Sequence, residues 1–264
     1  MNKSILFFLL GVGLLCSSCV SLSDLTYLQK KDGSDAESVV SQVVVKPYRL
    51  QSDDVISIVI KAIDPKLVAI FSPSTTGNET SQSEQGLYFS GFTVDDHGNI
   101  RIPILGEVNV IGYTLDEVRL KIEKQLLEEY FNKEADIFVT VKLAGLRYTI
   151  NGEVGAPGSR MLFKDRVTIL EAIANSGDIT TVGNRKEVTV IRQFPHGTEM
   201  HNVDLTDIDV MQSPYYYIQP NDYIYVKPLV QKTWGTGRTG IESLTTLISI
   251  LSLATTTFLL IRNN

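Results

Sequence analysis

Acidic and imidazole side chains that are close in the sequence are the first candidates for chemistry. Asp95, Asp96 and His97 are consecutive, and carboxylate and imidazole groups are metal ligands. Consecutive residues in a turn rarely converge on one ion, and Asp-Asp-His-Gly is ordinary turn chemistry, so we expect a turn and no metal site. Asp53 and Asp54 lead into a predicted strand, where neighbouring side chains point in opposite directions. A glycosidase needs two acids that face each other across the sugar, so we expect no catalytic residues and no cofactor.

Tyrosines near the C-terminal third are candidates for weak stacking on sugar rings. Aromatic residues are also ordinary strand formers with hydroxyls at the solvent edge, so we favour strand packing and keep sugar contact as the alternative. The candidate residues are Tyr216, Tyr217, Tyr223 and Tyr225.

Cys19 is a candidate for covalent modification. It follows an apolar run, residues 5–15, and two serines, a pattern typical of a bacterial secretory signal. Residues 15–19, Leu-Cys-Ser-Ser-Cys, resemble a lipobox, in which the cysteine sulfur is acylated and the cysteine becomes the N-terminus. The run of 11 residues is too short to span a bilayer, which needs about 20. We therefore predict a signal peptide over 1–18 and a lipid-anchored chain outside the cytoplasm; cleavage at another position is the alternative.

Composition limits the classes of function. Without residues 1–18 the chain has 246 residues, enough for one large domain or two small ones. Acidic residues outnumber basic ones by 30 to 24, which argues against nucleic acid as the main partner. Cys16 leaves with the signal peptide, so an acylated Cys19 would exclude an intrachain disulfide, a thiolate metal site and a cysteine nucleophile.

The pattern of strands and helices predicts an α+β fold with two small mixed-sheet domains. Each domain has one helix that begins at a capping box, Thr114 with Glu117 in the first and Thr168 with Glu171 in the second. Short β-branched runs supply the strands. These runs lie near residues 55–60, 92–94, 100–102, 106–110 and 137–143 in the first domain, and near 148–150, 188–191, 200–203 and 223–226 in the second.

A polar turn that leads into a strand occurs once in each domain. Residues 48–56, Tyr-Arg-Leu-Gln-Ser-Asp-Asp-Val-Ile, resemble residues 216–224, Tyr-Tyr-Ile-Gln-Pro-Asn-Asp-Tyr-Ile. We assign a polar tether to 19–45, the first domain to 46–143, the second domain to 144–228 and a glycine-rich linker to 229–240.

Residues 241–262 are predicted to form a C-terminal amphipathic transmembrane helix. The 21 residues from 241 to 261 would give a helix about 31 Å long, enough for a hydrocarbon core. At 100° per residue most leucines gather on one side and the polar side chains on the other, although Leu253 and Leu260 fall on the polar side. The polar side carries Glu242, Thr245, Thr246, Ser249, Ser252 and Thr256.

Three arrangements of this helix are compatible with its polar side. Hydroxyls that face lipid cost energy unless they find hydrogen-bond partners. A ring of copies could point them into an aqueous lumen, a lone or bundled anchor could bond them to its own carbonyls, and a buried helix could bond them to the protein. We favour the ring, in which the six polar residues line a pore.

Together these segments resemble the bacterial outer-membrane polysaccharide export family (OPX, Wza-type) over nearly the whole mature chain. Residues 48–58 are similar to the family's first motif, with Ser52-Asp53-Asp54 where the family usually has glycine-aspartate. Residues 152–158 and the Thr168 helix resemble the β-grasp module called SLBB (soluble ligand-binding β-grasp), and residues 217–226 its closing strand. The second motif is the strongest and comprises Val94, Asp96, Gly98, Ile100, Pro103, Gly106, Val108, Val110, Gly112, Thr114 and Glu117.

The resemblance implies a non-enzymatic outer-membrane lipoprotein, with most of the chain in the periplasm and the lipid in the inner leaflet. Copies would form a homo-oligomeric ring, often an octamer, and export capsular polysaccharide or exopolysaccharide through a barrel of their terminal helices. The expected partner is an inner-membrane polysaccharide co-polymerase, often joined to a tyrosine kinase. Two other functions remain open: a periplasmic adaptor lipoprotein whose helix only anchors it while a separate β-barrel is the conduit, and a sugar-processing enzyme.

Overall fold

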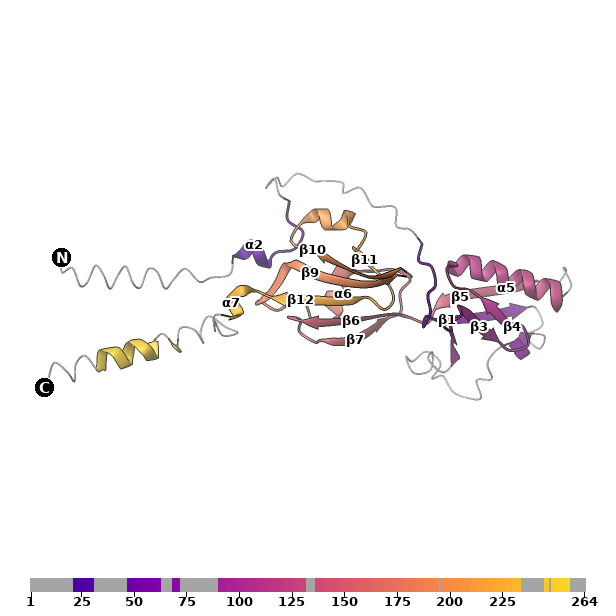
Figure 1. Cartoon of the computed structure of the whole chain (residues 1–264), viewed down its shortest axis with the longest axis horizontal. Helices are drawn as coiled ribbons and strands as arrows, with labels where there is room; N and C mark the ends of the chain where they lie inside the picture. Colours follow the sequence, from indigo (N-terminus) through magenta and orange to yellow (C-terminus); the bar gives the residue numbers. More distant parts are fainter. Residues whose placement is uncertain are drawn as a thin grey trace.

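The described part of the chain contains two hydrophobic cores, each with its own β-sheet (Figure 1). The computed structural model describes residues 21–30, 47–62, 68–71, 90–131, 136–194, 196–233, 245–246 and 248–256. The architecture is α+β, as the sequence predicts. Cys19 and Glu242 lie outside the described residues.

The first domain is a small antiparallel sheet covered by one helix. Its sheet has the order β2-β1-β5, and a separate hairpin pairs β3 with β4. Helix α5 buries Val118, Ile122 and Leu126, which recur at helical spacing on one face. The elements are β1 (Val55–Ala62), the 3₁₀ turn η1 (Ala69–Phe71), β2 (Phe92–Thr93), β3 (Asn99–Ile102), β4 (Gly106–Asn109), α5 (Leu115–Glu129) and β5 (Ile137–Leu143).

The second domain is a mixed five-stranded sheet with the order β10-β9-β12-β6-β7. Strands β12 and β6 are parallel at its centre, and the other neighbours are antiparallel. A short ribbon pairs β11 with β8 beside helix α6. The elements are β6 (Leu146–Gly152), β7 (Gly158–Leu162), β8 (Val167–Thr168), α6 (Ile169–Asn175), β9 (Gly183–Phe194), β10 (Gly197–Val203), the 3₁₀ turn η3 (Ile208–Gln212), β11 (Tyr217–Ile218) and β12 (Tyr223–Pro228).

Both predicted capping boxes are present. The Thr114 amide donates to Glu117 Oε2 at 2.7 Å, and the Glu117 amide donates back to Thr114 Oγ1 at 3.2 Å. Thr168 and Glu171 make the same exchange at 2.9 and 3.1 Å. Two of the orphan amides at the start of each helix are therefore satisfied locally, which fixes where α5 and α6 begin.

Residues 21–30 belong to the surface of the second domain, although the sequence places them in a tether. Helix α2 (Leu22–Leu25) lies against β9, as Figure 1 shows. The Leu28 amide donates to the Leu205 carbonyl at 3.1 Å, and the Gln29 carbonyl accepts from the Ile208 amide at 3.0 Å. These backbone hydrogen bonds join a polar segment to a distant loop, so the first domain is inserted, in sequence, between two parts of the second.

The C-terminal region contains the short helix α7 (Val230–Thr233), which begins inside the predicted linker, and a helical stretch at 245–246 and 248–256. Within the residues that the structure describes, no helix is both long enough and apolar enough to cross a bilayer. Only part of the predicted span 241–262 is among those residues.

Candidate functional site

The helical residues 245–246 and 248–256 include most of the predicted pore-lining residues. Each of these helical residues is exposed. Ser249 Oγ donates to the Thr245 carbonyl at 2.8 Å, and Thr256 Oγ1 donates to the Ser252 carbonyl at 2.7 Å. Hydroxyls in a helix commonly bond to the carbonyl one turn earlier. The donors of Ser249 and Thr256 are therefore satisfied within a single copy of the helix.

A further hydroxyl lies on the leucine side of the same stretch. At 100° per residue Thr255 falls between Ile248 and Leu251. Its Oγ1 is 2.9 Å from both the Leu251 and the Ser252 carbonyl oxygens. The hydroxyl is thus bonded to its own backbone, which lowers the cost of facing an apolar medium.

The four candidate tyrosines fall into two pairs. Tyr223 and Tyr225 alternate along β12 with the buried Ile224 and Val226, so the two tyrosines share the outer face of the sheet. The Tyr223 hydroxyl accepts a hydrogen bond from the Asn151 side-chain amide at 3.1 Å. The other pair, Tyr216 and Tyr217, lies at β11, with ring centroids 5.2 Å apart and the rings edge to face. The structure therefore offers no single platform of four rings.

The two acidic turns behave as the sequence predicts. The Asp95 carboxylate accepts hydrogen bonds from the His97 amide at 2.9 Å and the Asn99 amide at 2.8 Å. Asp53 is exposed whereas Asp54 is buried, so the two side chains point apart. Across the described part of the chain, no three histidine, cysteine or acidic residues are placed to hold a metal ion.

A buried ion pair in the second domain was not predicted. Arg192 Nε donates to Asp222 Oδ1 at 2.8 Å and Nη2 to Oδ2 at 2.7 Å, with both side chains almost fully buried. Burial raises the pKa of Asp222, and the guanidinium opposes this rise. The available signal was an arginine that directly follows the β-branched run 188–191, because a charge that continues a buried strand needs a partner.

A second unpredicted cluster surrounds Glu199 on β10. Its carboxylate is 2.9 Å from His196 Nε2 and 3.1 Å from His201 Nε2, and it accepts from the Tyr215 hydroxyl at 3.0 Å. Hydrogen bonds from His196, then His201, then Tyr215 lower the pKa of Glu199 to about 2. The His201 ring also stacks on Tyr215 at 4.0 Å between centroids. These contacts tie the β9–β10 hairpin to the chain that precedes β11.

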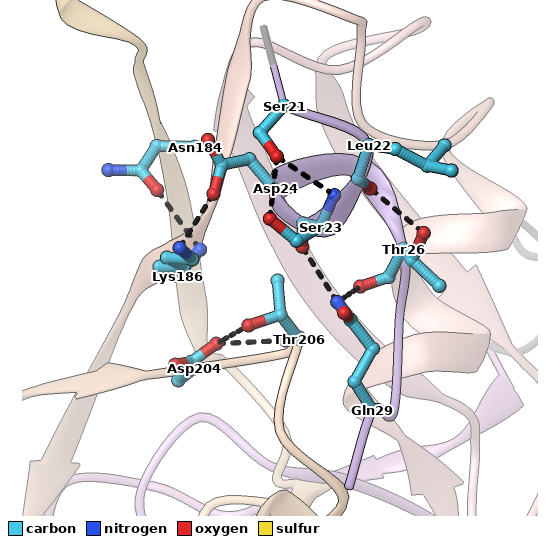
Figure 2. Close-up of polar contacts among 10 residues, drawn as sticks. All are labelled: Ser21, Leu22, Ser23, Asp24, Thr26, Gln29, Asn184, Lys186, Asp204 and Thr206. Atoms are coloured by element: carbon cyan, nitrogen blue, oxygen red, sulfur yellow. Dashed lines mark hydrogen bonds and ion pairs between the residues drawn. The ribbon is translucent and has the colours of Figure 1, made fainter. Parts of the chain in front are cut away.

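Residues 21–30, which follow the predicted lipidation site, contact one corner of the second domain, residues 178–187. The Asp24 carboxylate is 2.6 Å from Lys186 Nζ, and the Tyr27 hydroxyl donates to Asp178 Oδ1 at 2.5 Å. Figure 2 shows the Gln29 amide, which closes the turn after α2 by donating to two carbonyls, those of Ser23 and Thr26, each at 2.7 Å. Side-chain contacts therefore hold this segment against the sheet.

The segment that leads towards the C-terminal helical stretch contacts the same corner. The Leu229 amide donates to the Val182 carbonyl at 2.8 Å. Lys232 forms a close ion pair with Glu153, whose other carboxylate oxygen accepts from Thr180 Oγ1 at 3.1 Å. We call residues 178–187 with α2 and α7 the anchor corner. No local pattern predicts the anchor corner, because its parts are far apart along the chain.

Comparison with known proteins relates the first domain to a family. Residues 42–143 match the model of the family described as "Polysaccharide biosynthesis/export protein". A curated relative from Ralstonia nicotianae, "EPS I polysaccharide export outer membrane protein EpsA", is 28% identical over 149 residues, which are 55% of this chain and 39% of the relative. The protein of the same name from Ralstonia solanacearum is 27% identical over 158 residues, 58% of this chain and 41% of the relative.

The aligned region is about two-fifths of the length of each of these relatives. The family match, residues 42–143, includes the turn at Asp54, sheet β2-β1-β5 and helix α5, which build the core of the first domain. The first domain is therefore similar to the polysaccharide biosynthesis/export family.

Proposed function

We propose that this chain is an outer-membrane lipoprotein, acylated at Cys19, whose copies assemble into a ring that exports capsular polysaccharide or exopolysaccharide. The match of residues 42–143 to the polysaccharide biosynthesis/export family carries the proposal. The names of the Ralstonia relatives, which are polysaccharide export outer membrane proteins, support the substrate class and the location. The role is transport, with most of the chain in the periplasm.

The conduit would be a ring of the C-terminal helices. Each helix would turn its leucines to lipid and its polar side to an aqueous lumen, because a hydrated polymer moves through a polar pore without losing its water. Weak, repeated contacts suit a moving chain better than one tight site. The lumen would be lined by Glu242, Thr245, Thr246, Ser249, Ser252 and Thr256, and an inner-membrane co-polymerase would deliver the polymer from below.

The topology of the second domain supports its assignment as a β-grasp module of the SLBB type. In chain order its main strands are β6, β7, β9, β10 and β12, and across the sheet they take the order 4-3-5-1-2. The first and last strands are parallel neighbours at the centre, and α6 follows the first hairpin. This order with a single helix is the β-grasp arrangement.

A second function is supported by the hydroxyl groups of the C-terminal stretch. Ser249, Thr255 and Thr256 donate to carbonyls of their own helix, so these donors need no lumen. A helix of this kind could serve as a plain anchor of a periplasmic adaptor, with a separate outer-membrane conduit for the sugar.

The channel and the adaptor predict different effects on export when the polar side of the C-terminal helix is changed. We expect Ser249→Leu with Ser252→Leu to reduce surface polysaccharide strongly at unchanged protein level, since leucine would block wetting of the lumen. The matched control is Ile248→Leu with Leu251→Ile, which alters the leucine side at constant polarity and should leave export intact. Electron microscopy of the detergent-extracted protein should show rings. Unchanged export in the serine variant, or monomers in detergent, would favour the adaptor.

A further inference from the structure

The anchor corner brings together two segments from opposite ends of the chain. Asp24 in α2 forms an ion pair with Lys186, and Leu229, just before α7, donates its amide to the carbonyl of Val182, four residues earlier than Lys186. In Figure 1 both helices lie at the end of the second domain that is remote from the first domain. The segments around α2 and α7 therefore lie at the same end of the second domain.

The two short helices at this corner expose apolar side chains. Leu22 on α2 is 79% exposed and Val230 on α7 is 69% exposed. Single exposed leucines and valines are normal on protein surfaces, so exposure alone has no meaning here. The exposure of Leu22 and Val230 matters because of their positions in the sequence. Leu22 lies close to the proposed acylation site, and Val230 precedes the proposed membrane helix.

Chain length sets how far this corner can be from the bilayer. Ser21, the first described residue, follows Cys19 by two positions, and two extended residues span about 7 Å. Acyl chains on Cys19 can enter the hydrocarbon only if the sulfur is near the membrane surface. Because Asp24, Tyr27 and Leu28 hold the segment 21–30 on the second domain, this short connection keeps the whole second domain near the bilayer.

We propose that the anchor corner is a membrane-contact face, with Leu22 and Val230 inserted among the lipid headgroups and the first domain directed away from the bilayer. This inference rests on the proposed acylation of Cys19. Exposed apolar side chains that enter the headgroup region gain the free energy of their removal from water. The ion pairs Asp24–Lys186 and Lys232–Glu153 hold the two helices on the second domain.

The lipid surface is the one occupant that this geometry favours. A second copy of the chain could cover the same side chains with protein. It would not account for the connection of only two residues between Cys19 and Ser21, which keeps this corner near the acyl chains. The two occupants give different solvent accessibilities, which spin labels measure directly. Labels in lipid meet oxygen more often than a water-soluble nickel chelate, and labels in a protein interface meet neither.

The test uses the purified full-length mature chain in vesicles of phosphatidylethanolamine and phosphatidylglycerol. Leu22→Cys and Val230→Cys each introduce one reactive thiol, since acylation blocks the sulfur of Cys19. The control positions are Phe138→Cys on β5 and Met200→Cys on β10, at residues that are 66% and 67% exposed. We expect the oxygen-to-nickel accessibility ratio to be severalfold higher at positions 22 and 230 than at the controls.

Ratios at 22 and 230 equal to those at the controls, or low accessibility to both reagents, would overturn the membrane-contact face. Mass spectrometry of the N-terminal peptide in the same sample reports acylation separately. An acylated chain with water-exposed labels refutes this inference and leaves the proposed lipoprotein standing. An unacylated chain refutes the proposed lipoprotein and removes the short connection to the bilayer on which this inference rests, so it overturns both.

Discussion

The turns that lead into β1 and β12 have the same backbone but different electrostatic surroundings. In each, the aspartate carboxylate accepts the amide three residues earlier: Asp54 Oδ2 from Gln51 at 2.8 Å and Asp222 Oδ2 from Gln219 at 2.7 Å. In each, the preceding residue is left-handed, with φ of 70° at Asp53 and 65° at Asn221. The resemblance of 48–56 to 216–224 is therefore a resemblance of structure.

The two turns differ in the side chain that donates hydrogen bonds to the buried carboxylate. Asp222 is 1% exposed and bidentate to the Arg192 guanidinium. Asp54 is 3% exposed and accepts from the Tyr48 hydroxyl at 2.7 Å, while its Oδ1 is buried without a partner. The sequence motif thus determines the turn, and a residue outside the turn determines whether the buried charge is neutralised.

Breaking the charged pair in the second domain should give the largest effect. We expect Arg192→Met to lower the free energy of unfolding by about 3–5 kcal/mol, because Asp222 would remain as a buried, uncompensated charge. Urea unfolding measures the loss, and hydrogen exchange of β12 amides locates it in the second domain.

The comparison turn supplies the control for this prediction. Tyr48→Phe removes a neutral donor from Asp54, so we expect a smaller loss of about 1–3 kcal/mol in the first domain. Adding Asp222→Asn to Arg192→Met should recover part of the stability, since the amide keeps an acceptor for Gln219 without the charge. Equal losses from Arg192→Met and Tyr48→Phe would show that the guanidinium has no special role.

The buried Asp54 carboxyl should make the first domain more stable, not less, as the pH falls. Burial raises the pKa of Asp54 above its ordinary 3.8, against hydrogen bonds from Gln51 and Tyr48 that lower it. The folded state then binds a proton more readily than the unfolded state. The contribution of Asp54 to stability therefore grows as pH falls from neutral towards 3.8 and is lost as pH rises through the folded pKa.

Asp54→Asn should remove this contribution, because an amide does not titrate in this range. The measurement is hydrogen exchange of β1 and β5 amides between pH 4 and 7, compared with the unchanged chain. Asp53→Asn is the matched control, since it changes the exposed neighbour and keeps a residue that tolerates a left-handed backbone. Identical pH profiles for Asp54→Asn and the unchanged chain would refute the role of Asp54.

The same contrast explains what the sequence could predict. The turns, both capping boxes and the strand at 137–143 depend on residues within a few positions of each other, and all were predicted with correct bounds or nearly so. Strand β7 was missed because its residues are half-buried without alternation at the sheet edge, so no period-two pattern marks it.

The anchor corner and the Arg192–Asp222 pair were missed for a different reason. Asp24 meets Lys186, and Arg192 meets Asp222, through tertiary contacts that local spacing does not encode. The predicted lumen residues depend on contacts between copies of the chain, which the fold of one copy does not determine. Local chemistry was therefore predictable from the sequence, whereas the polar contacts between distant elements were not.

The smallest predicted effect concerns the backbone that the two turns share. Alanine in a left-handed conformation costs about 1 kcal/mol, whereas aspartate, asparagine and glycine tolerate it better. We therefore expect Asp53→Ala and Asn221→Ala to destabilise their domains by similar amounts of about 1 kcal/mol, and Asp53→Gly and Asn221→Gly to change stability by less than about 0.5 kcal/mol, because relief of strain offsets the added chain entropy. Urea unfolding of the four variants measures these changes. Unequal costs of alanine at the two positions would mean that the turns differ in backbone strain as well as in charge, whereas equal costs would confine their difference to Tyr48 and Arg192.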